Sequence, residues 1–145
     1  MDFFDRLIHA LTVLHPIHPM LVHFPIALSA AALLFITIAT IKKDRTYEKI
    51  AYANLVLTVF GTLAAGISGM HDNNVNYLGD APNANIKIIL AVILLAVSMI
   101  TVLIRKNNPD VLFSNGKVMY FGGYLISFLI AVVLAFLGGV ILYGF

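Results

Sequence analysis

Residues 14–41, LHPIHPMLVHFPIALSAAALLFITIATI, place three histidines and three prolines at the beginning of a long apolar run. From about residue 20 to residue 41 this run contains no Asp, Glu, Lys or Arg. A helix of that length rises about 33 Å, which is enough to cross the roughly 30 Å hydrocarbon core of a bilayer. The stretch therefore predicts a membrane-spanning helix that carries histidines where it enters the membrane.

The composition of the whole chain supports a membrane protein. Of the 145 residues, 61% are hydrophobic and only 11% are charged, and the mean hydropathy is +0.96. A water-soluble domain of this size needs a larger charged fraction to cover its surface. The net charge is only +2 and no basic stripe is present, which argues against a nucleic-acid partner. Without cysteine, the chain has no disulfide, thiolate metal site, iron–sulfur cluster or covalently attached c-type haem.

Three further apolar runs follow at about 50–70, 86–104 and 118–143, joined by short polar connections. We expect an all-α fold, an integral-membrane up-down four-helix bundle formed by residues 1–145 as a single membrane domain. Residues 2–14 are too short to span a bilayer, but their apolar side chains recur at helical spacing. This segment is predicted to be a short amphipathic helix on the membrane surface.

The basic residues predict the orientation. Two of the nine, Arg6 and Lys87, lie on one side of the predicted membrane. The other seven flank the first and third connections: Lys42, Lys43, Arg45, Lys49, Arg105, Lys106 and Lys117. Because basic residues favour the cytoplasmic side, we expect both termini to lie outside, in the periplasm of a bacterium with this protein in its inner membrane.

All five histidines then fall near the outer face. Those that precede or open the first span are His9, His15, His18 and His23, and His71 closes the second span. The orientation therefore gathers every imidazole at one end of the predicted bundle.

The prolines shape this histidine segment. His15 and His18 each precede a proline, which disfavours helical geometry and predicts an extended segment there. Pro19 suits the first turn of a helix, where its missing N–H is harmless. Pro25, one turn deeper, frees the carbonyl of Leu21 and predicts a bend below His23.

The second span has a strip of small residues. Gly61, Ala65 and Gly69 are spaced by four, so another helix or a flat ligand can approach the backbone closely. Gly66 flanks the strip. Asp72, directly after His71, could accept a hydrogen bond from an imidazole.

The run HPIHPMLVHFPIAL, residues 15–28, resembles the signature of a bacterial family of small four-span membrane proteins catalogued as domain of unknown function 2231. Members typically open with HP-x-HP-x-x-VHFP, matched here by His15, Pro16, His18, Pro19, Val22, His23, Phe24 and Pro25. The resemblance covers residues 14–145 and includes the glycine-rich second span. It implies relatives beside or fused to cytochrome c-like modules and a similarity to small b-type cytochromes, hence an electron-transfer setting.

The leading hypothesis is a non-covalent haem b held near the outer face by two axial histidines. We expect His23 and His71 to be this pair because their predicted depths match. His15 and His18 are the alternative ligands. Gly66 and Gly69 would line the haem wall, and Arg6 or Lys87 would pair with the propionates. A c-type cytochrome or a larger respiratory complex would then be the partner, and an electron-transfer or binding role is favoured over an enzyme.

Two other hypotheses remain open. The histidines could bind Cu or Zn, with Asp72 or Asp80 as an oxygen ligand. Alternatively, they are only interfacial side chains, the glycine strip only packs helices, and the protein is a structural or accessory subunit of a larger membrane complex. A homodimer is compatible with each hypothesis.

Overall fold

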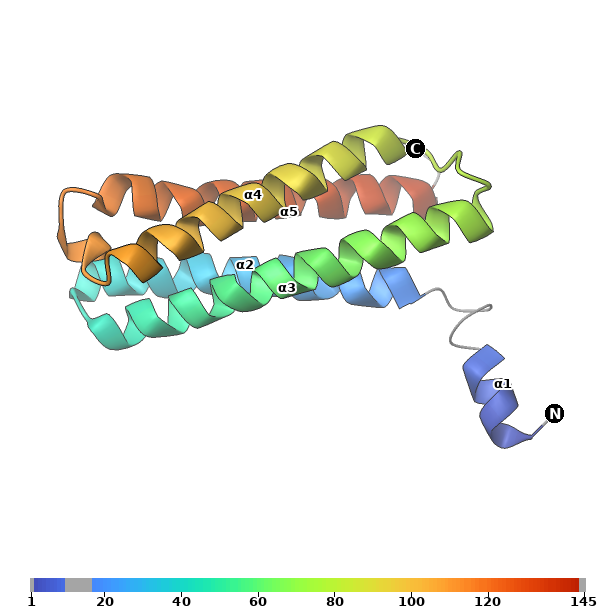
Figure 1. Ribbon diagram of the computed structural model, residues 1–145, viewed down its shortest axis with the longest axis horizontal. Helices are drawn as coiled ribbons and strands as arrows, with labels where there is room; N and C mark the ends of the chain where they lie inside the picture. Colours follow the sequence, from blue (N-terminus) through green and yellow to red (C-terminus); the bar gives the residue numbers. More distant parts are fainter. Residues whose placement is uncertain (1, 10–16, 144–145) are drawn as a thin grey trace.

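In a computed structural model of the chain, residues 2–9 and 17–143 are described, with the backbone alone for residues 140–143. Four long helices lie antiparallel in a bundle, which confirms the predicted fold class (Figure 1). The elements are α1 (Phe3–His9), α2 (Ile17–Lys42), α3 (Arg45–Asn76), α4 (Ala84–Asn107), a short 3₁₀ turn η2 (Val111–Phe113) and α5 (Lys117–Tyr143). Each of the four long helices is long and apolar enough to cross a membrane.

Helix α3 is longer than the apolar run at 50–70. It begins early because the Asp44 carboxylate caps it and accepts a hydrogen bond from the Thr46 amide at 2.7 Å. It ends late, where Gly79 takes a positive φ of 87° and its amide donates to the carbonyl of Asn73 at 2.9 Å. At 32 residues the helix rises about 48 Å and extends beyond the hydrocarbon core.

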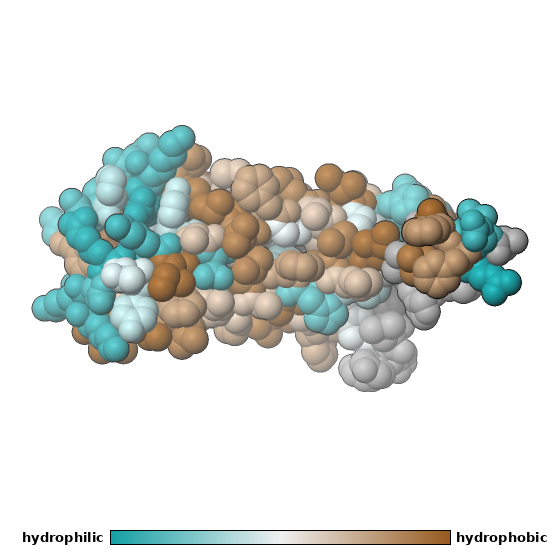
Figure 2. Space-filling view, turned by 90° about the horizontal axis from the view of Figure 1, so that it is seen from below, coloured by the Kyte–Doolittle hydropathy of each residue, from teal (hydrophilic) through white to brown (hydrophobic). Residues whose placement is uncertain are grey.

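The two ends of the bundle differ in composition. We call the end with the α2–α3 connection and η2 the basic end, because seven of the nine basic residues lie there. The opposite end, with the start of α2 and the α3–α4 connection, is the histidine end. Figure 2 shows polar residues gathered over the basic end and an apolar band along the helices beyond it.

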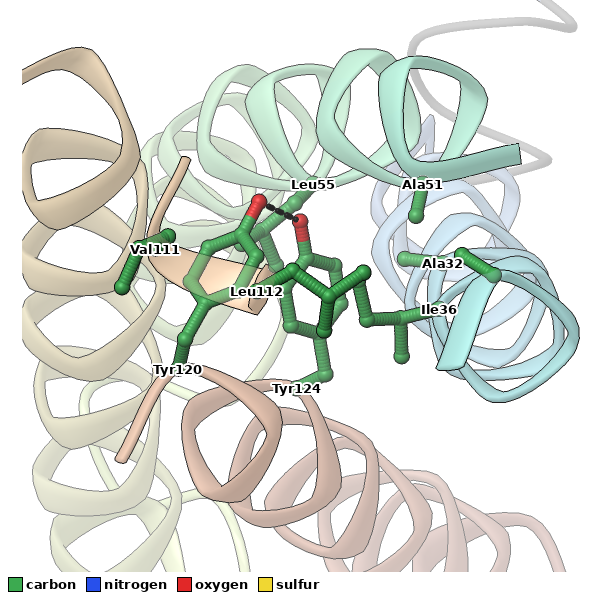
Figure 3. Packing of buried hydrophobic residues seen from close by; sticks show 9 residues of the cluster. Ala32, Ile36, Ala51, Leu55, Val111, Leu112, Tyr120 and Tyr124 are labelled. Carbon is green, nitrogen blue, oxygen red and sulfur yellow. Dashed lines mark hydrogen bonds between the residues drawn. The ribbon is translucent and has the colours of Figure 1, made fainter. Parts of the chain in front are cut away.

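The tightest packing lies toward the basic end (Figure 3). Small side chains such as Ala32 and Ala51 let α2 and α3 approach closely, while Tyr120 and Tyr124 fill the space beside α5. The buried cluster consists of Ala32, Ile36, Ala39, Ala51, Leu55, Val111, Leu112, Tyr120 and Tyr124. This half of the molecule is a continuous core.

Packing is sparser toward the histidine end. Among the described side chains, none of α4 before Leu94 is buried and none of α5 beyond Ala131 is buried. A Cβ atom added at Gly66, Gly138 or Gly139 would meet nothing within 4 Å. The described side chains therefore leave open space beside the helices at this end.

Helices α2 and α3 contact each other along the glycine strip. A Cβ at Gly61 would lie 3.2 Å from Pro25 Cδ, and one at Gly69 would lie 2.8 Å from His18 Cε1. The expected extended segment at His18 is wrong, because α2 already includes this residue. Docking of its ring on α3 accounts for the helical geometry, which the local preference before Pro19 disfavours. Pro19 lies in the first turn, as expected, and the helix continues through Pro25.

Helix α1 has no buried residue and lies apart from the bundle (Figure 1). Phe3 and Phe4 are 71% and 68% exposed, as a helix that lies on a membrane surface requires. The remainder of the predicted surface helix, residues 10–14, and the candidate ligand His15 are outside the described residues.

Candidate functional site

His18 is the one candidate ligand whose described ring docks between two helices. It is half-buried, and its Nδ1 lies 3.1 Å from Ser68 Oγ. The Ser68 hydroxyl donates its single hydrogen to the Ala65 carbonyl at 3.0 Å, so it accepts from His18 Nδ1–H. This network assigns the neutral ring a free electron pair on Nε2. The Ala65 carbonyl also interacts with the His18 ring, and no described side chain hydrogen-bonds Nε2.

In His23, as in His18, the hydrogen of the neutral ring is assigned to Nδ1, but its acceptor is a backbone carbonyl. Its Nδ1 lies 2.5 Å from the carbonyl oxygen of Pro19, which can only accept, so Nδ1 carries the proton. The side chain is exposed. Since five residues separate His18 from His23, they point about 140° apart around α2. The two rings therefore cannot ligate the same metal ion from opposite sides.

The sequence predicted that His23 and His71 lie at the same depth in the membrane. In the structure they lie at different depths. The contacts of Gly69 with His18 and of Gly61 with Pro25 set the register of α2 against α3. In this register His71 lies about seven residues, or about 10 Å, farther out than His23. His71 is exposed and lies about 200° around α3 from Gly69, the residue against which the His18 ring packs, so it shares the depth of His18 but not the face that His18 contacts. It is therefore nearer in depth to His18 than to His23.

Charged groups from two further positions interact electrostatically with His18. The Asp72 carboxylate interacts with both His18 and Lys87, so groups from α2, α3 and α4 lie within electrostatic range of one another. Asp72 also accepts a hydrogen bond from the Asn76 amide. Arg6, by contrast, lies in α1, apart from the bundle. Within the described ranges no group of three or more His, Cys, Asp or Glu side chains is arranged to hold a metal ion.

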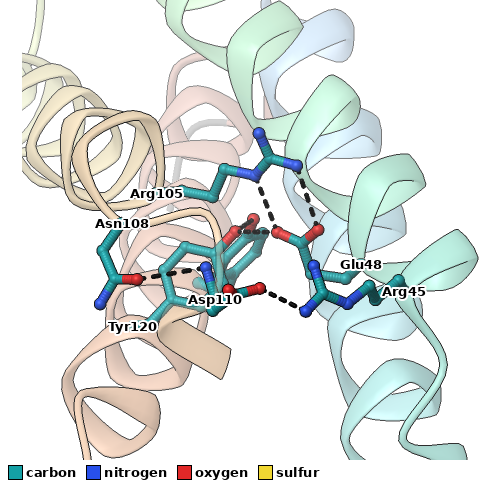
Figure 4. A network of polar contacts seen from close by, with 7 residues as sticks. Arg45, Glu48, Arg105, Asn108, Asp110 and Tyr120 are labelled. Atoms are coloured by element: carbon teal, nitrogen blue, oxygen red, sulfur yellow. Dashed lines mark hydrogen bonds and ion pairs between the residues drawn. The ribbon is translucent and has the colours of Figure 1, made fainter. Parts of the chain in front are cut away.

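A polar network at the basic end was not anticipated from the sequence (Figure 4). Glu48 is only 2% exposed, and its carboxylate accepts from Arg105 Nε at 3.1 Å and Nη2 at 3.3 Å. Tyr120 donates its hydroxyl to Glu48 Oε1 at 2.9 Å. Tyr124 in turn donates to the Tyr120 oxygen at 2.8 Å, because the Tyr120 hydrogen is already used. The carboxylate thus joins α3, α4 and α5.

The signal for Glu48 was its position on the buried face of α3. That face consists of Glu48, Ala51, Leu55, Thr58, Val59, Thr62 and Ala65, which recur at helical spacing. A carboxylate on such a face needs internal partners. Around it, the Arg105 guanidinium lies 4.5 Å from the centre of the Tyr52 ring, and Arg45 pairs with Asp110 at the surface. Both oxygens of the Glu48 carboxylate accept hydrogen bonds from neighbouring helices. We call this network of Glu48, Arg105, Tyr120 and Tyr124 the Glu48 clasp, because it links α3, α4 and α5.

Four apolar helices, short connections and a histidine-bearing first span define a small multi-span helical membrane protein. A family model described as predicted membrane protein (DUF2231) matches residues 14–144. The chain belongs to this family, and the match takes in all four long helices but not α1. Comparison with curated proteins and with solved structures gave no significant match.

Proposed function

We propose that this membrane protein binds a b-type haem at the histidine end and transfers electrons, with His18 and His71 as axial ligands. The observation that carries the proposal is the orientation of His18. Ser68 fixes Nδ1 as the donor, and Nε2 keeps the electron pair that iron requires. Ligating histidines usually have their second ring nitrogen held in this way.

The surroundings of His18 support a flat ligand there. Gly69 lies under the ring, and Gly66 on the same helix has open space beside it, so a macrocycle would not have to displace the Gly66 side of α3. Lys87 lies within electrostatic reach of the same cluster and supplies a cation for a propionate. His71, one turn from Ser68, is the described histidine of α3 that could complete the pair.

The charge bias gives the proposal an orientation. Seven basic residues at the opposite end favour that end in the cytoplasm. The histidine end then faces the periplasm of a bacterial inner membrane. There a c-type cytochrome or a larger respiratory complex would exchange electrons with the haem.

A second candidate is a Cu or Zn site on His18. It is favoured by the interaction of Asp72 with the same imidazole, because a carboxylate beside a neutral imidazole suits these metals. This arrangement would need a further ligand to complete the coordination.

The test is the visible spectrum of protein purified from haem-replete cells and reduced with dithionite, combined with metal analysis by mass spectrometry. We expect sharp low-spin b-type bands that are lost in His18→Ala and in His71→Ala. His9→Ala, on α1, is the control and should keep them. Loss in His23→Ala but not in His18→Ala would overturn the ligand assignment. A stoichiometric Cu or Zn without haem bands would favour the second candidate, and neither signal would favour an accessory subunit.

A further inference from the structure

An open apolar groove of about 360 Å³ lies at the basic end of the bundle, away from the histidines. It is bounded by Thr40 near the end of α2, by Leu112 of η2 and by the first turns of α5. Its walls are almost entirely carbon. The groove therefore favours a hydrocarbon occupant.

One cation stands at the rim of the groove. Lys117, the first residue of α5, is the single ionisable side chain among its lining residues. From Lys117 to Leu125, the deepest lining position along α5, the helix rises about 12 Å. One leaflet contributes about half of the roughly 30 Å hydrocarbon core. The groove thus has nearly the length of one leaflet, with a positive charge where headgroups lie.

The Lys117 ammonium forms no ion pair with any residue that the structure describes. Arg45 pairs with Asp110 and Arg105 pairs with Glu48, while the Lys42 ammonium lies 5.1 Å from the centre of the Tyr47 ring. Lys117 has no ion pair with a described residue and is exposed. Its ammonium is available to an external anion.

We propose that this groove binds one acyl chain of an anionic phospholipid from the leaflet at the basic end, with the lipid phosphate paired to Lys117. Charge complementarity selects this occupant. A basic group beside an apolar surface between spanning helices suits an anionic headgroup. A zwitterionic lipid offers the same chains but no net negative charge.

Gly122 gives a way to fill the groove without disturbing the bundle. It lines the groove, and a Cβ there would meet nothing within 4 Å. Gly122→Leu should therefore occupy the space of the chain. Gly138 lies on the same helix, outside the groove, and is equally open, which makes Gly138→Leu the matched control.

The experiment is native mass spectrometry of the detergent-purified full chain, titrated with phosphatidylglycerol and phosphatidylcholine that carry identical chains. We expect the wild type to bind one phosphatidylglycerol about fivefold more tightly than phosphatidylcholine, as one nearby basic residue provides. Lys117→Gln should remove this preference, while Lys106→Gln should keep it. Gly122→Leu should weaken both lipids at least fivefold, and Gly138→Leu should weaken neither.

Four results would overturn the proposal. Equal binding of the two lipids by the wild type would show that the headgroup charge is not recognised. Equal losses in Lys106→Gln and Lys117→Gln would show a general charge effect in place of a site. Undiminished binding in Gly122→Leu would show that no chain enters the groove, and loss of a dimer in that variant would assign the groove to a second copy of the chain.

Discussion

The two ends of the bundle differ in how the polar side chains between their helices are hydrogen-bonded. At the basic end, the Glu48 carboxylate finds all its partners inside the protein. At the histidine end, the half-buried His18 ring contacts Ser68 through Nδ1, and no described side chain hydrogen-bonds its Nε2. Polar groups that serve stability are normally satisfied internally. Ligating histidines usually have one ring nitrogen held by a neighbouring group, and this difference between the ends is the reason the proposed haem is placed at the histidine end.

The largest effect is expected for Glu48→Ala. Removal of the carboxylate leaves Arg105 and Tyr120 without their partner, and we expect a loss of about 3 kcal/mol in the free energy of unfolding. The value is at the low end for a buried pair because the Arg105 side chain is 20% exposed. Unfolding in a denaturing detergent titration measures it.

The matched control for that variant is Asp110→Ala, in the neighbouring ion pair with Arg45. Both side chains of this pair are about 60% exposed, so we expect a loss below about 1 kcal/mol. Equal losses in the two variants would contradict the distinction between a buried clasp and a surface pair.

The second effect tests the close contact of α4 with α5. A Cβ at Gly123 would lie 2.0 Å from Thr101 Oγ1 and 2.9 Å from its Cγ2, so Gly123→Ala must separate the helices. We expect a loss of about 2 kcal/mol in unfolding free energy. Thr101→Ala in the same chain should recover part of it. Gly122→Ala, next along α5 and open, should change stability by less than about 0.5 kcal/mol, and a loss as large as that of Gly123→Ala would refute the contact.

The third effect tests the orientation of His18 and rests on the proposed haem. Ser68→Ala removes the group that holds Nδ1, and we expect about tenfold weaker haem affinity, measured by titration of the protein with hemin. Thr37→Ala is the control, since its hydroxyl bonds only to the Leu33 carbonyl of its own helix. Unchanged affinity in Ser68→Ala would show that Ser68 does not prepare the ligand.

The smallest effect is expected for Gly69→Ala. Its new Cβ would meet the His18 ring at 2.8 Å, and a ring on a flexible side chain can rotate away. We expect a stability loss below about 1 kcal/mol with displacement of the imidazole. Gly66→Ala, where nothing lies within 4 Å, should be nearly neutral. A loss above 2 kcal/mol in Gly69→Ala would show that this glycine sets the spacing of the helix backbones.

The lengths of the apolar runs were sufficient to predict the four spans, because the bilayer thickness fixes how many residues a crossing helix needs. The glycine strip of α3 predicted that another group packs closely against it, but it did not predict which group. That group is α2 itself, through Pro25 and His18, since register depends on contacts far apart in the sequence. For the same reason local rules placed His18 outside the helix, and tertiary docking overrode them.

Glu48 shows why the rest of the site escaped prediction. A single acid near the start of a span is typical of a solvated helix end. Its partners come from positions 57 and 72 residues later in the chain, so only the folded bundle shows which groups satisfy the carboxylate.

The contact between Gly123 and Thr101 has a mechanical consequence. Thr101 is six residues from the end of α4 at Asn107 and seventeen from its beginning at Ala84, which correspond to arms of about 9 Å and 26 Å. The close contact of α4 with α5 therefore lies nearer to the basic end of α4 than to its histidine end. A rotation of α4 about it displaces the tip at the histidine end about three times as far as the tip beside the Glu48 clasp. The long arm of α4 therefore reaches the histidine end, where Lys87 of α4 lies within electrostatic range of Asp72.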